Sequence, residues 1–268
     1  MRILVTNDDG IGSPGVWALA EAMSRLGETL LVAPDAERSG AGTSVSLHSG
    51  MNVVEVSSSI DGVRAYAVGG TPTDCVILGL WQLAQGDVDL VVSGINLGGN
   101  MGTDILYSGT VMATLQGFYR RIPSMAVSLA IQGETPHMSF DVAAKLAELL
   151  ALSMRSAAMP DGAILNVNVP SIAPELIKGI AITTAASRSY VRLVAAQRSG
   201  QLEYSWSAET AAEMGADEGT DIWAVYGGSI SITPLRPAVT DHGSIPALTQ
   251  HVPTLESGLL RQVLDGLE

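Results

Sequence analysis

Short apolar runs alternate along the first 170 residues with longer segments in which apolar side chains recur every three or four positions. The first pattern is typical of strands buried on both faces, and the second is typical of helices with one apolar face. We predict strands over residues 2–6, 29–33, 89–93, 124–129 and 163–169, and helices over residues 14–26, 110–121 and 140–155. Ser13 is expected to cap the first helix. This alternation predicts an α/β fold with a doubly wound, Rossmann-like, mainly parallel sheet.

The pattern changes after Pro170, where the predicted strands follow one another without helices between them. Residues 179–185 form one predicted strand. Residues 190–197 and 202–207 flank the turn-forming dipeptide Ser199-Gly200, which is typical of a β-hairpin. The sequence therefore predicts a hairpin arm in the last third of the chain.

Apolar side chains at four-residue steps predict an amphipathic helix over residues 254–267. We expect a Rossmann-like core over residues 1–178 and a C-terminal segment over residues 179–268. The segment would contain the hairpin arm, at about residues 186–210, a return to the core sheet and the terminal helix. An arm and a terminal helix are typical of contacts between subunits, and packing on the chain's own sheet is an equally open alternative.

The charge balance limits the partners. The chain has 27 acidic and 14 basic residues, a net charge of −13, so it repels polyanions and anionic membrane surfaces. We therefore expect no nucleic-acid partner and no membrane partner. The apolar start is too short for a secretory signal, no apolar run reaches about 18 residues, and the single Cys75 cannot form an internal disulfide. These features predict a cytoplasmic protein.

Three loops after predicted strands carry polar residues that suit chemistry. In a parallel sheet such loops meet at one edge, where ligands bind. The first loop contains the neighbouring carboxylates Asp8 and Asp9, whose repulsion requires a cation or a proton to offset it. The second contains Arg38 and Ser39. The third is rich in glycine and leads to Thr110 at a predicted helix start, where main-chain N–H groups can receive a phosphate.

Together the loops offer four oxygen ligands, namely Asp8, Asp9, Ser39 and Asn96. Hard oxygen donors suit Mg²⁺ or Mn²⁺ better than zinc. A divalent ion held there would offset the repulsion between the two carboxylates, bind a phosphoryl oxygen and polarise a water molecule for attack. Such an ion also explains how an acidic, lysine-poor chain can accept phosphate.

Six ordered blocks of the sequence resemble the SurE (survival protein E) family. They are Asn7-Asp8-Asp9-Gly10-Ile11, the stretch from Ala33-Pro34-Asp35 to Arg38-Ser39-Gly40, Gly70-Thr71-Pro72-Thr73-Asp74-Cys75, Ser93-Gly94-Ile95-Asn96, Tyr107-Ser108-Gly109-Thr110-Val111 and Leu165-Asn166-Val167-Asn168-Val169-Pro170. Thr220-Asp221 and Ser231-Ile232-Thr233-Pro234-Leu235 extend the likeness towards the C-terminus. The blocks cover most of the chain, so the resemblance is highly specific.

The resemblance implies a phosphatase that depends on one divalent metal ion per subunit, Mg²⁺ or Mn²⁺. Its implied substrates are nucleoside 5′- and 3′-monophosphates, with short polyphosphate as a further candidate. The implied metal ligands are Asp8, Asp9, Ser39 and Asn96, and the implied catalytic residues are Asp8, Asp9 and Asn96. The candidate phosphate-binding residues are Arg38, Asn100, Ser108, Gly109 and Thr110. Relatives form oligomers by exchanging the hairpin and C-terminal segments, which implies a homodimer or homotetramer.

The chain departs from the family pattern in two places. Gly12-Ser13 stands where relatives often carry His-Ala, and Gln116 stands where many carry Glu. Neither change removes an implied ligand, so we expect them to affect either the choice of substrate or the hydrogen bonds around the ligands, and the preferred base stays open.

Two alternatives remain open. A covalent phosphatase would use Asp8 as its nucleophile, although adjacent aspartates are not the usual spacing for that mechanism. A nucleotide or metal sensor would use the same crevice without turnover. The scattered histidines, with no HExxH and no Gly-x-Ser-x-Gly motif, disfavour a zinc hydrolase or a serine hydrolase.

Overall fold

The computed structural model describes the chain except residues 134–135, 156–162, 199–200, 209–214, 238 and 255–268. The chain divides into two compact units, Met1–Leu235 and Arg236–Glu268. The first unit contains the sheet and its covering helices. The described part of the second unit contains the helix α8 (Ile245–Thr254).

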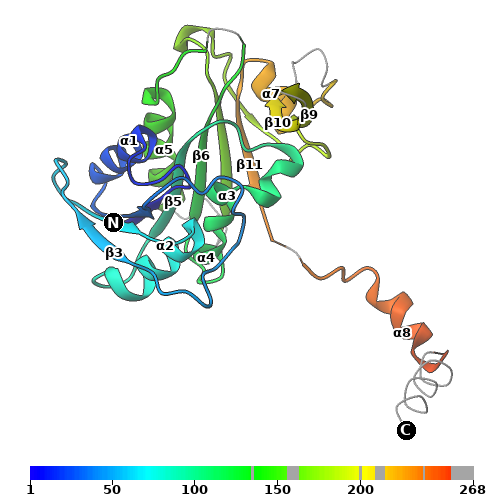
Figure 1. Cartoon of the computed structure of the whole chain (residues 1–268), viewed down its shortest axis with the longest axis horizontal. Helices are drawn as coiled ribbons and strands as arrows, with labels where there is room; N and C mark the ends of the chain where they lie inside the picture. Colours follow the sequence, from blue (N-terminus) through cyan, green and yellow to red (C-terminus); the bar gives the residue numbers. More distant parts are fainter. Residues whose placement is uncertain (134–135, 156–162, 199–200, 209–214, 238, 255–268) are drawn as a thin grey trace. The chain divides into compact units, whose positions relative to one another are not determined.

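Nine of the described strands form one sheet, in the order β3-β4-β2-β1-β5-β6-β7-β11-β8. The strands β5, β6 and β11 of this sheet are labelled in Figure 1. The bounds are β1 Arg2–Thr6, β2 Glu28–Pro34, β3 Val53–Val56, β4 Val63–Val68, β5 Leu90–Leu97, β6 Ser124–Ala130, β7 Ile164–Pro170, β8 Ile180–Ile182 and β11 Ile230–Leu235. Neighbouring strands from β4 to β7 pair in parallel, while β3 and β11 run antiparallel to β4 and β7. The doubly wound, mainly parallel α/β fold is thereby confirmed.

Helices cover both faces of the sheet because successive strand residues point to opposite sides. Along β1, Ile3 and Val5 pack with α1 (Pro14–Ser24) and α5 (Asp141–Arg155), whereas Leu4 packs with α2 (Pro72–Leu78). The face of α2 also carries α3 (Gly109–Ala113), α4 (Leu115–Phe118) and α7 (Asp221–Tyr226). Shorter helical segments are the π-helical turn Gly79–Leu83 and the 3₁₀ segments Gly102–Tyr107 and Pro174–Leu176. Among the described helices, none has the length and apolar character that crossing a membrane requires.

Two local predictions are wrong. The Ser13 side chain makes no capping hydrogen bond, although its backbone is extended as an N-cap requires. The helix predicted over residues 110–121 is divided into α3 and α4 at Thr114, whose hydroxyl donates to the carbonyl of Val111 at 2.6 Å. A hydroxyl that competes with the main chain in this way commonly bends or interrupts a helix.

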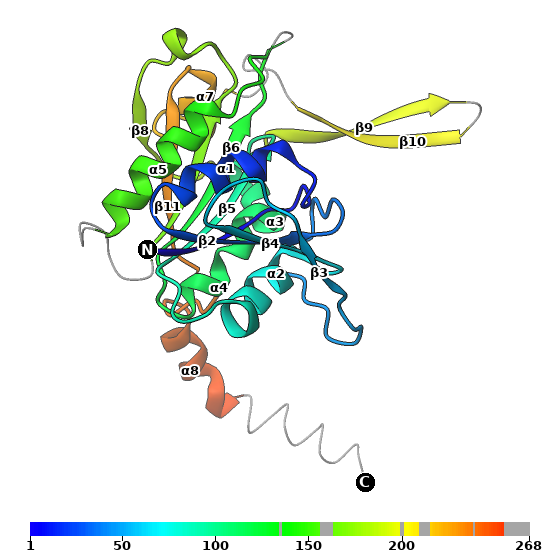
Figure 2. The ribbon, with the colours of Figure 1, turned by 90° about the vertical axis from the view of Figure 1, so that its left-hand side faces the viewer.

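The predicted hairpin is confirmed. β9 (Val191–Arg198) and β10 (Gln201–Ala208) pair antiparallel as a separate two-stranded ribbon (Figure 2). In the register of this pair, Ala195 lies opposite Tyr204. The helix predicted over residues 254–267 lies outside the described residues except for Thr254, where α8 ends. The division of the chain at residue 178 stays a prediction.

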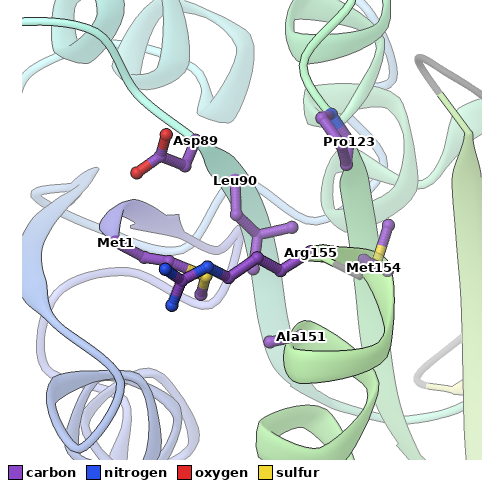
Figure 3. Close-up of a pocket in the computed structure, with 7 residues that line it drawn as sticks. All are labelled: Met1, Asp89, Leu90, Pro123, Ala151, Met154 and Arg155. Carbon is purple, nitrogen blue, oxygen red and sulfur yellow. The ribbon is translucent and has the colours of Figure 1, made fainter. Parts of the chain in front are cut away.

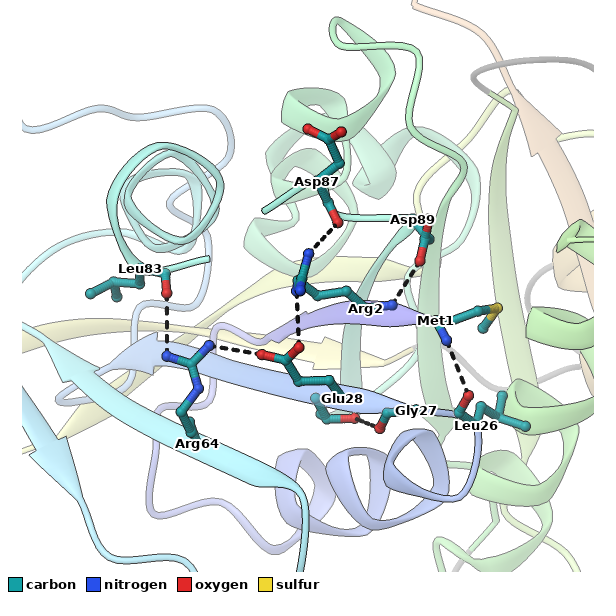
Figure 4. A network of polar contacts seen from close by, with 10 residues as sticks. Met1, Arg2, Leu26, Gly27, Glu28, Arg64, Leu83, Asp87 and Asp89 are labelled. Carbon is teal, nitrogen blue, oxygen red and sulfur yellow. Dashed lines mark hydrogen bonds and ion pairs between the residues drawn. The ribbon is translucent and has the colours of Figure 1, made fainter. Parts of the chain in front are cut away.

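The amino ends of the strands carry a polar network. Glu28 accepts hydrogen bonds from Arg2 and from Arg64, each at 3.0 Å, and the main-chain N–H of Arg2 donates to Asp89 at 2.7 Å (Figure 4). Beside it lies a cavity of about 290 Å³, lined by Met1, Asp89, Leu90, Pro123, Ala151, Met154 and Arg155 (Figure 3). Both features lie at the amino ends of the strands. The predicted site residues lie at the opposite edge of the sheet, at the carboxyl ends.

Candidate active site

Asp8 joins three loops at the carboxyl edge of the sheet. The apolar strand β1 ends at Thr6, and the side-chain amide of Asn7 donates to the carbonyl of Gly10 at 3.0 Å, which closes the turn. Asp8 is only 4% exposed, and its carboxylate accepts a hydrogen bond from the Thr110 hydroxyl. Its main-chain carbonyl accepts a hydrogen bond from the N–H of Arg38 at 2.7 Å. The structure therefore brings the loops after β1 and β2 against the start of α3.

Gly109 provides the room for this contact. A Cβ at Gly109 would lie 2.8 Å from the Asp8 Cβ and 2.9 Å from its Oδ2, closer than real Cβ atoms approach other atoms. Ser108 caps α3, because its hydroxyl accepts a hydrogen bond from the N–H of Val111 at 3.1 Å. The glycine in this block is therefore required by the close approach of the Asp8 side chain rather than by an unusual backbone angle.

Asp9 and Asn96 lie together at the ends of β1 and β5. The main-chain N–H of Leu97 donates to Asp9 Oδ2 at 3.2 Å. The Asn96 side-chain amide donates to the carbonyl of Gly98 at 2.8 Å, so Asn96 Oδ1 is its remaining acceptor. Each hydrogen bond orients a side chain and leaves one of its oxygens available for a ligand.

The pKa values of both carboxylates are raised above their usual range. Burial raises the pKa of Asp8, and hydrogen bonds from Thr110 oppose that increase. Burial, and after it the charge of Asp8, raises the pKa of Asp9 to about 6, while the Leu97 N–H opposes the rise. Burial is thus the main cause of both shifts, and the negative charge of Asp8 adds to the rise only at Asp9.

The donor set fits a divalent cation. Within the described residues, no group of three histidine, cysteine or acidic side chains gathers as a metal site. A cation here would therefore combine Asp8 and Asp9 with neutral oxygens, of which Asn96 Oδ1 is one. Two carboxylates with neutral oxygens and water are the usual environment of Mg²⁺.

The loop after β2 contacts Asp8 through its main chain rather than through its side chains. The Ser39 hydroxyl donates to Glu37 at 2.9 Å, and the Arg38 guanidinium pairs with Asp35 at 3.3 Å. Both predicted residues are exposed, and these bonds stay within their own loop rather than reaching Asp8. The sequence analysis missed Glu37, whose charge adds to the rise in the pKa of both site aspartates.

Asn100 is buried and held by residues that the sequence analysis did not assign to the site. Its side-chain amide donates to Ser128 on β6 at 2.8 Å. Its main chain is hydrogen-bonded by Asn166 and Asn168 on β7. The sequence signal for these contacts was the alternation of asparagines within the buried strand β7, because buried side-chain amides need hydrogen-bond partners.

Two further carboxylates fix the segment that follows Asn100. Asp221, which is fully buried, accepts hydrogen bonds from the N–H groups of Gly102 at 2.8 Å and Ala186 at 3.0 Å. Asp104 accepts hydrogen bonds from the hydroxyls of Tyr107 and Ser189. The glycine-rich loop is therefore attached to the residues that precede β9.

Comparisons with known proteins agree with this arrangement. A sequence model of the family described as "Survival protein SurE" matches residues 3–192. A Thermus thermophilus protein named 5′-nucleotidase SurE 1 is 43% identical over 251 residues, which cover 93% of this chain and 97% of that protein. A Dehalococcoides mccartyi protein named 5′-nucleotidase SurE is 42% identical over 236 residues, or 88% of this chain and 89% of that protein.

The crystal structure of the SurE protein from Aquifex aeolicus superimposes with a TM-score of 0.78 at 36% sequence identity. The match covers 93% of this chain and 99% of that chain. Sequence and fold therefore agree over nearly the whole length, including the loops that carry Asp8, Asn96 and Thr110. The chain belongs to the SurE family.

Proposed function

We propose that the protein hydrolyses nucleoside 5′- and 3′-monophosphates to nucleosides and phosphate, and that it needs a divalent metal ion. The relatives named 5′-nucleotidase support the reaction class. The observation that carries the proposal is the buried Asp8, which is hydrogen-bonded to Thr110 and lies next to Asp9, whose pKa is raised. That arrangement suits a cation and a phosphoryl group at one place.

The proposed metal site takes one Mg²⁺ or Mn²⁺ ion per subunit. Its ligands would come from Asp8, Asp9, Ser39 and Asn96. The bound ion would supply charge for a phosphoryl oxygen and lower the pKa of a water molecule. Thr110 and the Leu97 N–H orient the two carboxylates, which limits the reorganisation needed when the ion binds.

The proposed phosphate side consists of Asn100, Ser108, Gly109, Thr110 and Arg38. Ser108 and Thr110 present hydroxyls at the buried start of α3, and Gly109 lets the main chain approach closely. The hydrogen bonds of Asn100, Ser108 and Thr110 hold these residues in place. Such positioning supports hydrolysis of a phosphomonoester, because positioning supplies much of the rate in phosphoryl transfer. Short polyphosphate is a further proposed substrate.

A panel of nucleoside monophosphates tests the proposal directly. Phosphate release would be measured with Mg²⁺, with Mn²⁺ and with chelator, for 5′ and 3′ esters and for tripolyphosphate. We expect metal-dependent turnover, and a loss of at least about 100-fold in kcat/KM for Asp8→Asn, since an oriented ligand is removed. Asp87→Asn is the matched control, because Asp87 is exposed at the opposite edge of the sheet.

Turnover by Asp8→Asn at the wild-type rate would contradict the site assignment. If the wild type turned over no substrate and nucleotides only raised the melting temperature, the chain would instead be a nucleotide sensor.

We also propose that the protein forms a homodimer or homotetramer through the hairpin arm and C-terminal segment. A two-stranded hairpin is at best marginally stable alone, and Tyr204 and Val194 are exposed on it. Light scattering of the wild type and of a variant with residues 191–208 replaced by a short Gly-Ser linker tests this. A linker variant that keeps the wild-type mass per particle, after allowance for the deletion, would contradict a role for the arm.

A further inference from the structure

The strand β7 separates two kinds of side chain onto its two faces. Leu165, Val167 and Val169 belong to the apolar cluster shared with α1 and α5. Asn166 and Asn168 point to the other face, and both are fully buried. Burying a side-chain amide in an apolar environment is unfavourable unless its donors and acceptor find hydrogen-bond partners. Two such residues within five therefore require a specific set of partners.

Within the described part of the chain, the hydrogen bonds of these two side-chain amides all run to one residue, Asn100, and Asn166 Oδ1 makes none. Asn168 Oδ1 accepts a hydrogen bond from the Asn100 N–H at 2.8 Å, and Asn168 Nδ2 donates to the Asn100 carbonyl at 3.0 Å. Asn166 Nδ2 donates to the same carbonyl at 2.8 Å. Asn168 therefore satisfies both main-chain groups of Asn100, as a paired strand would.

The side chain of Asn100 is fixed by the neighbouring strand. Its Nδ2 donates to the Ser128 hydroxyl on β6 at 2.8 Å. Ser128 lies opposite Asn168 in the register of β6 and β7. The main chain and the side chain of Asn100 are thus held by two adjacent positions of the sheet, and the second hydrogen of Asn100 Nδ2 remains to donate to a ligand oxygen.

Buried hydroxyl side chains on the neighbouring strand β11 make a contrasting set. Ser231 lies opposite Asn168 in β11 and is fully buried. Its hydroxyl bonds to Thr183 at 2.7 Å, and Thr183 bonds to Thr233 at 2.8 Å. These hydroxyls connect strands to one another. The asparagines instead connect the sheet to a loop that carries a proposed substrate-binding residue.

We propose that Asn168, together with Asn166 and Ser128, is a positioning residue that holds the Asn100 side chain in its substrate-binding orientation. This inference rests on the proposed function, and it assigns to the asparagines of β7 a part in the reaction rather than in stability alone. A side chain displaced by about 1 Å can lower a rate by about 100-fold. The loss should appear mainly in kcat, because Asn168, Asn166 and Ser128 act on the alignment of the Asn100 side chain with the substrate.

The test is a double-mutant cycle between positions 168 and 100, measured by phosphate release from a nucleoside monophosphate. Asn168→Ala should lower kcat by about 100-fold and change KM by less than about threefold. In the Asn100→Ala background the same change should lower kcat by less than about threefold, because the side chain that Asn168 positions is already absent although the main-chain hydrogen bonds remain. Ser231→Ala is the matched control, and we expect it to leave kcat unchanged.

Hydrogen exchange gives a readout that does not depend on turnover. Because the Asn100 N–H donates to Asn168, the peptide containing residues 98–102 should exchange faster in Asn168→Ala and at the wild-type rate in Ser231→Ala. If Asn168→Ala does not fold, Ser128→Ala makes a smaller change at the same target. That variant should lower kcat by about tenfold, and again only when Asn100 is present.

The outcomes separate this inference from the proposed function. A wild type that releases no phosphate from any substrate would contradict the function. An active wild type would overturn the inference alone if Asn168→Ala kept its kcat. Equal losses of kcat in the presence and absence of the Asn100 side chain would also overturn it, because a purely structural role predicts additive effects.

Discussion

Adding one methyl group at Gly109 tests whether the position of the Asp8 carboxylate controls the reaction. The Cβ of Gly109→Ala would lie 2.8 Å from the Asp8 Cβ, whereas ordinary contact begins at 3.4 Å. The two atoms must therefore separate by about 0.6 Å. Asp8 is buried and its main chain is bonded to Arg38, so the movement falls on the side chain that is hydrogen-bonded to Thr110.

The expected effects on stability and on rate differ in size. Overpacking in a well-packed region costs about 1–3 kcal/mol. Replacing glycine by alanine within a helix recovers about 0.5–1 kcal/mol. The net change in the free energy of unfolding should therefore be about 2 kcal/mol or less, which a stable domain tolerates. A shift of several tenths of an ångström in an aligned group should lower kcat/KM by about 10- to 100-fold.

The assay compares Gly109→Ala with Gly50→Ala in phosphate release and in urea unfolding. Gly50 is exposed in the segment between β2 and β3, and a Cβ there meets no atom within 4 Å. We expect the control to keep its activity and Gly109→Ala to lose it while remaining folded. A folded Gly109→Ala enzyme with the wild-type kcat/KM would refute the claim that the placement of Asp8 matters.

Two further predictions concern stability. Tyr190→Phe removes the hydroxyl that donates to the Gly99 carbonyl, and should lower the free energy of unfolding by about 1–2 kcal/mol in urea titrations; an unchanged midpoint would contradict a contribution from that bond. Hydrogen bonds from Arg64 and then Arg2 hold the pKa of Glu28 below its usual value. The stabilisation by Glu28 is therefore present above its unfolded pKa and is lost as the pH falls through its folded pKa. Glu28→Gln should cost ~0.5–1 kcal/mol at pH 7, since the pair is partly exposed, and progressively less as the pH falls through the folded pKa of Glu28; a cost that does not change with pH would contradict this account.

The regular part of the fold could be predicted because its strands are buried on both faces and read as continuous apolar runs. β1, β2, β6 and β7 match their predicted ranges within one residue at each end, whereas β5 continues four residues beyond its predicted end. β3 and β4 were not predicted, and β11 was predicted only as a return to the core sheet, without a residue range. β3 lies at the sheet edge with most of its side chains exposed, and β11 buries Ser231 and Thr233 on one face, so neither gives a continuous apolar run.

Which residues could form the site was readable from the sequence, but not how they are held. Asp8 and Thr110 are 102 residues apart, and only the folded sheet shows that one donates to the other. Polar side chains in strands were equally hard to interpret, because their partners lie on distant segments. Asn168 bonds to Asn100, which is 68 residues earlier in the chain.

Metal binding in the absence of substrate tests the central claim most directly, because it isolates the role of the neighbouring carboxylates. Mn²⁺ would be titrated into the wild type, Asp8→Asn and the control Asp87→Asn, with free Mn²⁺ measured by electron paramagnetic resonance. The account predicts one Mn²⁺ per chain in the wild type and in the control, and at least about tenfold weaker binding in Asp8→Asn. Equal Mn²⁺ affinity in all three proteins would contradict it.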